Sequence, residues 1–330
     1  MEIIYIIALL IVSTCFTFII HELGHLVGGI FTSHVFDSLY FSIFFIYKEG
    51  NILRFKIRKI TLYNFFRGHC VIIPNEDYKQ YRPFWSNFTG PLFSLITAFI
   101  FVIVLFTIEN ESYLLNSFIN QLMYQNFAVG LFSLFPHRIS YQHSDGYNII
   151  RGFYPLDRRS MYVFETFDSA IKAGKRLSDF DSGLLYVKPD EKIKNFWAAF
   201  LVTIYASHLA DKGEQDQAAK EFHRINLRLL PYGIRCEIKC ELLYYYLIYN
   251  FNEKKCKEIY DDTEMKSYIK QNKVTPKRVL AAYTWIILDE KCNGEQLLKE
   301  ATALAKQLDG GYQVMELDRI EDFSRYKSTV

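Results

Sequence analysis

Long apolar runs occupy the first 136 residues, whereas residues 155–330 carry the mixed charged and apolar pattern of soluble helices. Residues 3–20 contain no charged side chain and are long enough for a helix that crosses a bilayer. A second run of this length covers 84–108, and a third, more polar run covers 114–135. The pattern therefore predicts a membrane core of about three spanning helices, followed by a soluble part.

Amide side chains interrupt the third run. Polar groups within a bilayer are costly, and they usually face the interior of a helix bundle. We therefore expect this helix to pack inside the bundle and to make less contact with lipid than the other two. The interrupting residues are Asn116, Asn120, Gln121, Gln125 and Asn126.

The basic residues near the membrane predict an orientation. The segment at 109–114, between the second and third runs, has two glutamates and neither Lys nor Arg. Cytoplasmic loops are enriched in Lys and Arg. We therefore expect a multi-pass protein of the cell membrane, with its N-terminus outside and residues 33–83 and the C-terminal half in the cytoplasm. The basic residues between the first two runs are Lys48, Arg54, Lys56, Arg58, Lys59, Arg67, Lys79 and Arg82.

Residues 51–73 have a pattern of their own. Basic and apolar residues alternate at its start, and β-branched and aromatic residues follow. This pattern predicts a pair of strands, a β-hairpin beside the membrane. Such a hairpin is either a plain cytoplasmic loop or an edge that pairs with an extended peptide, and the sequence leaves both interpretations open.

Helical patterns come in pairs from residue 195 onward. A small or apolar residue recurs after each turn, at Ala218, Cys256 and Leu297. A spacing of roughly 40 residues is typical of helix-turn-helix repeats of the tetratricopeptide type. Such repeats would bind a protein partner or the substrate, whereas a plain helical bundle would only cap the membrane domain. Nothing in this half has a catalytic pattern, because His208 and His223 lie on separate predicted helices.

These elements together predict a mainly α-helical chain of three parts. Residues 1–155 form a membrane domain of about three spanning helices with its β-hairpin. Residues 156–194 form a linker. Residues 195–330 form a cytoplasmic, soluble helical domain that is similar to tetratricopeptide repeats.

The composition narrows the class of partner. The chain has 330 residues, of which 50% are hydrophobic and 22% are charged, so it is neither disordered nor a disulfide scaffold. Its net charge of +2 gives no basic excess that would bind nucleic acid. The six cysteines include no CxxC pair, which favours buried, reduced thiols and a reducing compartment for the soluble half.

The sequence HELGH at 21–25 carries the clearest chemistry. On a helix, His21 and His25 lie one turn apart on one face, which suits two imidazoles that bind one zinc ion. Glu22 lies beside them and can accept a proton from water at such an ion. Ionisable groups at the end of a spanning helix are costly, so they indicate a functional site.

A catalytic zinc ion needs a third protein ligand and one open position. Asp145, in the SDG sequence just beyond the third run, is the best candidate. It stands at the expected start of a helix whose N-terminus Ser144 would cap. His137 and His143 compete with it, since imidazole also binds zinc.

Three sequence blocks resemble the site-2 protease family of intramembrane zinc metalloproteases. They are HELGH in the first run, FTGPLFSL near the start of the second, and the stretch from Asn126 through LFSLFP to Asp145 after the third. The resemblance covers residues 1 to about 155. The ordered set of three blocks inside spanning segments is more specific than HELGH alone.

The resemblance implies a site with one zinc ion per chain. The implied metal ligands are His21, His25 and Asp145, and the implied catalytic base is Glu22. It implies weaker roles in substrate positioning for Asn126, Gly90 and Pro91. The chain departs from the family at Ser94 and Ser133, where asparagine is frequent, and this bears on the support of the substrate.

The expected function is hydrolysis of peptide bonds by an intramembrane zinc endopeptidase. The expected substrate is a small protein or peptide of the lipid bilayer, cut within or near a transmembrane or signal-like segment. Because a helix hides its carbonyls in hydrogen bonds, we expect this segment to contain a helix-weakening stretch. The alternative is a non-proteolytic membrane scaffold whose helical repeats bind a partner. Metal content distinguishes the two.

Overall fold

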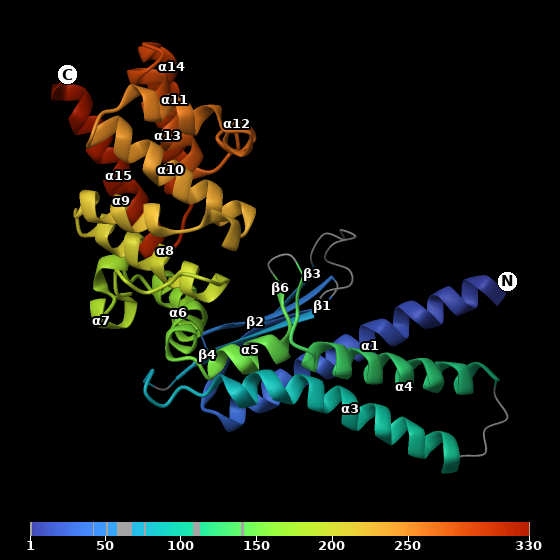
Figure 1. Ribbon diagram of the computed structural model, residues 1–330. Coiled ribbons are helices and arrows are strands. Elements are labelled where there is room, and N and C mark those ends of the chain that lie inside the picture. The colour runs from blue at the N-terminus through green and yellow to red at the C-terminus, as the bar shows by residue number, and fades with distance from the viewer. Residues whose placement is uncertain are drawn as a thin grey trace. The chain divides into compact units, whose positions relative to one another are not determined.

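The computed structural model is mainly helical with a small antiparallel sheet, which confirms the predicted fold class in its coarse form (Figure 1). It describes residues 2–41, 43–50, 52–57, 68–75, 77–107, 113–139 and 142–329. The chain divides into two compact units, Met1–Thr166 and Phe167–Val330. Most of the predicted segment at 109–114 lies outside the described residues.

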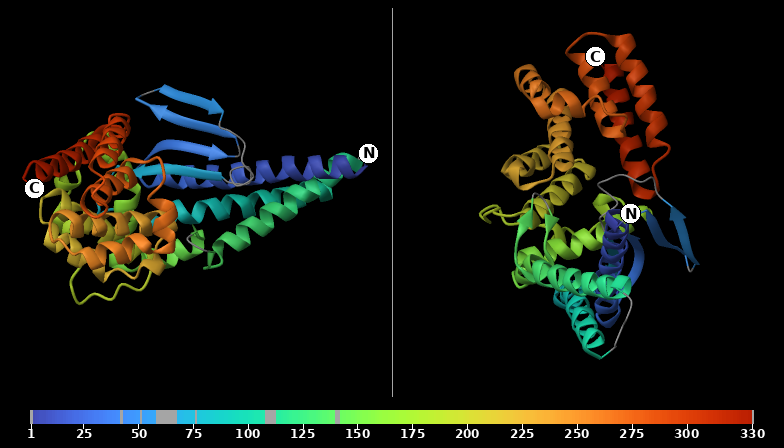
Figure 2. Two further views of the ribbon diagram at one scale, coloured as in Figure 1. Left: turned by 90° about the horizontal axis from the view of Figure 1, so that it is seen from above. Right: turned by 90° about the vertical axis from the view of Figure 1, so that its right-hand side faces the viewer.

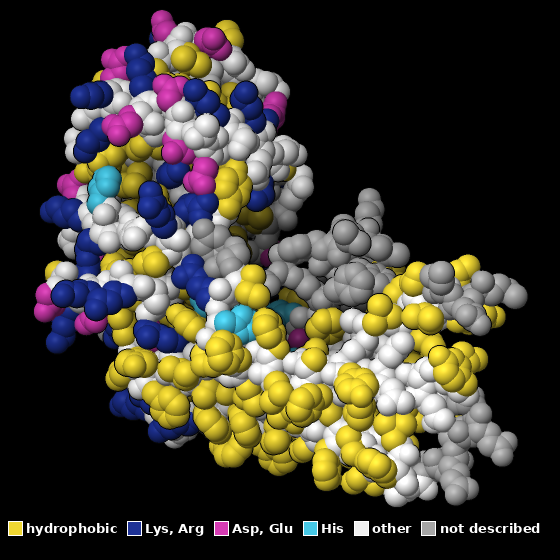
Figure 3. All heavy atoms as spheres, turned by 45° about the vertical axis from the view of Figure 1, so that its right-hand side comes forward, with side chains coloured by type: hydrophobic (Ala, Val, Ile, Leu, Met, Phe, Trp, Pro, Cys, Tyr) yellow, Lys and Arg dark blue, Asp and Glu magenta, His cyan; other side chains and the backbone are white. Residues whose placement is uncertain are grey.

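Three long helices form the body of the first unit. They are α1 (Glu2–Phe31), α3 (Pro83–Thr107) and α4 (Tyr113–Leu134), and they lie side by side (Figures 1 and 2). Within the described part of the chain, α1 and α3 are the two helices that are long and apolar enough to cross a membrane. Hydrophobic side chains gather over the surface of this unit, whereas charged side chains gather over the second unit (Figure 3).

Three amide side chains of α4 bond to α1. Ser13 donates a hydrogen bond to Gln121, and Thr17 donates one to Gln125. Asn126 is fully buried. The predicted third run therefore forms a helix in which three of the five amides, at Gln121, Gln125 and Asn126, bond to hydroxyls of α1.

The antiparallel sheet beside α1 has the strand order β3-β2-β1-β4. Its strands are β1 (His34–Phe41), β2 (Phe44–Glu49), β3 (Ile52–Ile57) and β4 (Gly68–Pro74). The predicted hairpin at 51–73 is wrong. Both of its strands exist, but β3 pairs with β2 and β4 pairs with β1, so they are the two opposite edges of the sheet. Residues 58–67 of this segment lie outside the described residues.

The sheet packs on α1 through a small apolar core. Leu39 of β1 and Cys70 and Ile72 of β4 are buried together, and Leu26 of α1 packs against them. Along β4 the side chains alternate, so that Gly68, Cys70 and Ile72 point to one face and His69 and Val71 to the other. This alternation brings one face of β4 against the helix that carries HELGH.

Two short elements follow α4 and lead to the second unit. A two-stranded ladder, β5 (Arg138–Ile139) and β6 (Gln142–His143), precedes α5 (Asp145–Gly152). Helix α6 (Pro155–Lys172) then carries the chain across the division between the units. The segment predicted as a linker, 156–194, also contains a 3₁₀ turn (Leu177–Asp179) and α7 (Ser182–Leu185).

The second unit consists of helices, most of which pack against the next one along the chain. Three pairs of neighbours recur, α8 with α9, α10 with α11, and α13 with α14. Ala218 and Cys256 are buried, as expected of small residues after a turn, whereas Leu298 is buried in place of Leu297. The helices are α8 (Phe196–Asp211), α9 (Gln215–Arg224), α10 (Tyr232–Ile248), α11 (Glu253–Asp261), α12 (Thr263–Tyr268), α13 (Val274–Ile286), α14 (Lys291–Ala305) and α15 (Gly310–Thr329).

All six cysteines are free thiols, and four of them are buried. The prediction of buried thiols is wrong for Cys292, which is exposed on α14, and Cys15 is only partly buried.

Candidate metal centre

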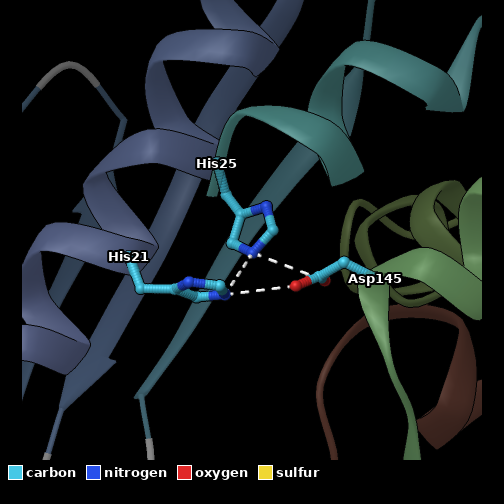
Figure 4. A group of neighbouring side chains, drawn as sticks. All are labelled: His21, His25 and Asp145. Atoms are coloured by element: carbon cyan, nitrogen blue, oxygen red, sulfur yellow. Dashed lines mark hydrogen bonds and ion pairs between the residues drawn. The ribbon is translucent and has the colours of Figure 1, made fainter. Parts of the chain in front are cut away.

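Two histidines and one aspartate converge between α1 and α5 (Figure 4). His21 and His25 lie one turn apart on α1, and their Nε2 atoms are 3.2 Å from each other. Asp145 is the first residue of α5. Its Oδ2 atom lies 3.1 Å from Nε2 of His21, and its Oδ1 atom lies 3.5 Å from Nε2 of His25.

These separations suit a tetrahedral ion. For metal–ligand bonds of about 2.0–2.2 Å, the edges of a tetrahedral site measure about 3.3–3.6 Å. The three observed edges, 3.1, 3.2 and 3.5 Å, lie close to this range. Among the residues that the structure describes, these three side chains form the one group of at least three His, Cys, Asp or Glu that could hold a metal.

The other nitrogen of each imidazole is held by α3. Nδ1 of His25 donates a hydrogen bond to the main-chain oxygen of Ser86 at 2.6 Å. A carbonyl oxygen only accepts, so the proton of neutral His25 lies on Nδ1 and the lone pair of Nε2 points toward Asp145. Nδ1 of His21 lies 3.1 Å from the hydroxyl of Ser94. Partners of this kind orient histidine ligands and raise their affinity for metals.

The ring of His25 packs directly against Gly90 of α3. A Cβ atom at this position would lie 2.4–2.8 Å from ring atoms of His25, a distance that no real side chain tolerates. The predicted pair Gly90 and Pro91 is buried within α3. In the described structure, Gly90 therefore packs against the ring of His25.

Asp145 owes its position to the N-terminus of α5. As predicted, Ser144 caps this helix and accepts a hydrogen bond from the main-chain N–H of Tyr147. The Ser144 hydroxyl also donates to the carbonyl oxygen of Phe135, just beyond α4. The cap thus ties the start of α5 to the end of α4, and Asp145 follows directly.

The two competing histidines lie apart from the group. His137 donates from Nδ1 to the carbonyl oxygen of Phe135, and its ring contacts Phe132. His143 stacks on Tyr147. Burial and then the positive charge of Arg138 lower the pKa of His143 to about 4, so its ring is neutral at pH 7. Of the three candidates for a third ligand, the structure brings Asp145 to the two histidines.

The carboxylate of Glu22 lies against the sheet. Its Oε2 atom accepts a hydrogen bond of 2.7 Å from the main-chain N–H of Cys70, in β4. Glu22 is therefore next to His21 in the chain but is held by a different element. It is 8% exposed and does not belong to the group of three.

Asn126 of α4 lies in the interface with α1. Its Nδ2 atom donates to the hydroxyl of Thr17, one turn before His21, and to the carbonyl oxygen of Leu122. Its buried Oδ1 atom has no hydrogen-bond partner in the part of the chain that the structure describes. The sequence offered no signal for the roles of Thr17, Ser86 and Ser94, because each of them arises from contact between helices.

Access to the group differs among its members. The side chain of His21 is 9% exposed, whereas those of His25 and Asp145 are 14% and 17% exposed. All three side chains are thus mostly buried, and His25 and Asp145 retain slightly more exposure than His21. Three protein ligands with one open position are the arrangement of catalytic zinc, whereas structural zinc sites have four protein ligands.

No protein-family model matches the chain, and no curated protein or solved structure is significantly similar to it. Function is therefore inferred from the side chains at 21, 22, 25 and 145 and from their geometry.

Proposed function

We propose that this protein is an intramembrane zinc endopeptidase of the site-2 protease type. One observation carries the proposal: Nε2 of His21, Nε2 of His25 and the carboxylate of Asp145 meet at the spacing of a tetrahedral ion. The partners of both Nδ1 atoms support it, since they direct the two Nε2 atoms to that point.

The chemistry follows from the residues around this point. Zinc, when bound there, supplies a Lewis acid that polarises a peptide carbonyl and acidifies water. Glu22 accepts a proton from the attacking water and returns it to the leaving amine. Asp145 brings the negative charge that offsets a divalent ion between two neutral imidazoles. Gly90 keeps the ring of His25 in place.

The surroundings of the site suit a substrate within a membrane. Helices α1 and α3 are long and apolar enough to span a bilayer, and α4 is the third spanning helix of the proposal. Residues 33–83 and the second unit lie in the cytoplasm, and the N-terminus lies outside. The substrate is a transmembrane or signal-like peptide with a helix-weakening segment, since a helix hides its carbonyls in hydrogen bonds.

The helix pairs of the second unit bind a protein partner or the substrate itself. Their packing of each helix on the next supports an arrangement similar to tetratricopeptide repeats. The alternative function is that of a membrane scaffold without proteolytic activity. In that case the second unit would bind a partner and the chain would hold no metal.

Metal analysis of the purified full-length protein tests the proposal. We expect about one zinc ion per chain in the wild type and almost none in the double variant His21→Ala/His25→Ala. The variant His223→Ala, in the second unit, is the matched control and keeps its zinc. Absence of zinc from the wild type, or its persistence in the double variant, would overturn the proposal.

A trapping experiment tests the activity separately. Glu22→Gln keeps the three ligands and removes the proposed base, so it should hold zinc and fail to cleave. Crosslinking this variant in membranes, followed by mass spectrometry, should identify a bound membrane peptide that wild-type protein cuts. If Glu22→Gln cleaves that peptide at the wild-type rate, Glu22 is not the base.

A further inference from the structure

The strand β4 meets the carboxylate of Glu22 through its backbone. The N–H of Cys70 donates to Oε2 of Glu22 at 2.7 Å, within a buried contact between residues 48 positions apart. Oε1 of Glu22 has no hydrogen-bond partner among the described residues. One oxygen of the carboxylate is therefore fixed, and the other remains able to accept a proton.

This N–H is available because β4 is an edge strand. Among the described residues its one neighbour in the sheet is β1, and Cys70 stands opposite Leu39 in that pairing. In an antiparallel pair, alternate residues direct their N–H and C=O groups away from the neighbour. Cys70 is such a residue, and its outward N–H reaches α1.

Gly68, two residues earlier on the same face of β4, leaves room for this carboxylate. A Cβ atom at position 68 would lie 2.7 Å from Cγ of Glu22 and 2.9 Å from its Oε1 atom. A side chain there would force Glu22 to move. The space left at Gly68 and the N–H of Cys70 thus together hold the carboxylate of Glu22, and we call these two residues its seat.

We propose that this seat in β4 positions Glu22 for catalysis, so that Gly68 and Cys70 are positioning residues of the base. The inference rests on the proposed function, because it assigns these residues to that same reaction. Glu22 follows His21 by one residue and so lies about 100° around α1 from it. The helix alone leaves the rotamer of Glu22 undetermined, and the strand fixes it. Misplacement of a reacting group by about 1 Å can cost on the order of 100-fold in rate.

The contact itself is tested without metal and without activity. Full-length protein labelled with ¹⁵N-cysteine, in detergent micelles, gives one amide signal for each of six cysteines. The signal that Cys70→Ala removes belongs to Cys70. We expect its amide proton to shift upfield in Glu22→Ala, because the bond to a carboxylate is lost, while the signal of Cys240 stays in place. An unchanged Cys70 signal would overturn the inference.

The kinetic role is tested with Gly68→Ala. A synthetic membrane-spanning peptide that the wild type cleaves serves as the substrate. We expect kcat to fall about 10-fold or more, with KM and zinc content unchanged, because the ligands and the binding surface are intact. The matched control is Val71→Ala, on the opposite face of β4, which should keep the wild-type kcat.

A second variant guards against simple misfolding. Cys70→Pro removes the N–H on an edge strand, where proline is tolerated, and should reproduce the loss of kcat at constant zinc content. If Gly68→Ala keeps the wild-type kcat, the seat does not position the base. The same conclusion follows if either variant loses zinc and shows a higher KM. A wild type without zinc would instead refute the proposed function, while the Cys70 amide signal would still test the contact.

Discussion

Nδ1 of His21 lies 3.1 Å from the hydroxyl oxygen of Ser94, and both groups are buried at the contact of α1 with α3. The hydroxyl can donate or accept, so it adapts to either tautomer of the ring. The contact leaves Nε2 of His21 facing Asp145. Ser94 thus contacts one of the three residues that converge at the candidate metal centre.

We predict that Ser94→Ala weakens metal binding without abolishing it. Loss of a group that orients a ligand typically costs about 10–100-fold in metal affinity or activity. Competitive titration of zinc with a chelator would measure the change. Ser133→Ala is the matched control, because among the described residues that hydroxyl bonds to the Gly130 carbonyl oxygen within α4 alone. Equal affinities for the two variants would contradict the role of Ser94.

Asp145→Asn should lose zinc and activity together while the protein stays in the membrane. The substitution keeps the volume and the helix start but removes the negative charge. Two imidazoles then remain to hold the ion. His143→Ala, two residues earlier, should keep most of both properties. A fully active Asp145→Asn with a metal-free His143→Ala would mean that the third ligand is His143.

Reporter fusions would test the orientation. We expect a reporter fused after Asn110 to signal the outside and one fused after Val330 to signal the cytoplasm. The reason is the concentration of Lys and Arg between the first two apolar runs. The reverse pattern would contradict the orientation inferred from the basic residues. Equal signals at both positions would show that the run at 114–135, which lies between the two reporters, does not cross the membrane.

Asp211 should make the second unit sensitive to acid. Burial by itself raises the pKa of Asp211, but hydrogen bonds from Arg176 and from Ser178 outweigh it and hold that pKa below its usual value. A carboxyl with a lowered pKa stabilises the fold fully above its unfolded pKa, about 3.9. This contribution is lost as the pH falls through the folded pKa.

Thermal unfolding of the full-length protein would detect this effect. Asp211→Asn should unfold at a lower temperature than the wild type at pH 7, and the gap should narrow as the pH falls below about 4. Asp190→Asn, an exposed control, should shift the midpoint little. If the difference between the two unfolding temperatures does not change with pH, the charge of Asp211 is not what stabilises its contact with Arg176 and Ser178.

The local features of the site were predictable from sequence, because each depends on a short stretch of chain. Helical spacing places His21 and His25 on one face, and the sequence SDG places Asp145 at a helix start that Ser144 caps. The separation of an apolar half from a charged half follows from composition. These signals need no knowledge of which elements touch.

The sheet could not be predicted in the same way. Residues 34–49 are apolar or aromatic at most positions, so they lack the alternation that marks a half-buried strand, and β1 and β2 were missed. Strands β3 and β4 were expected, but β1 and β2 lie between them in the sheet. Pairing depends on tertiary contacts, as does the bond from Cys70 to Glu22.

His21 and Asp145 are 124 residues apart in the chain. During synthesis, both histidines exist long before the carboxylate that faces them, and α3 and α4 must be made in between. A chain cut short before α5 therefore lacks one of the three converging groups, whatever the state of its helices. The order of the chain thus delays assembly of the complete donor set until α1, α3, α4 and the start of α5 have been translated.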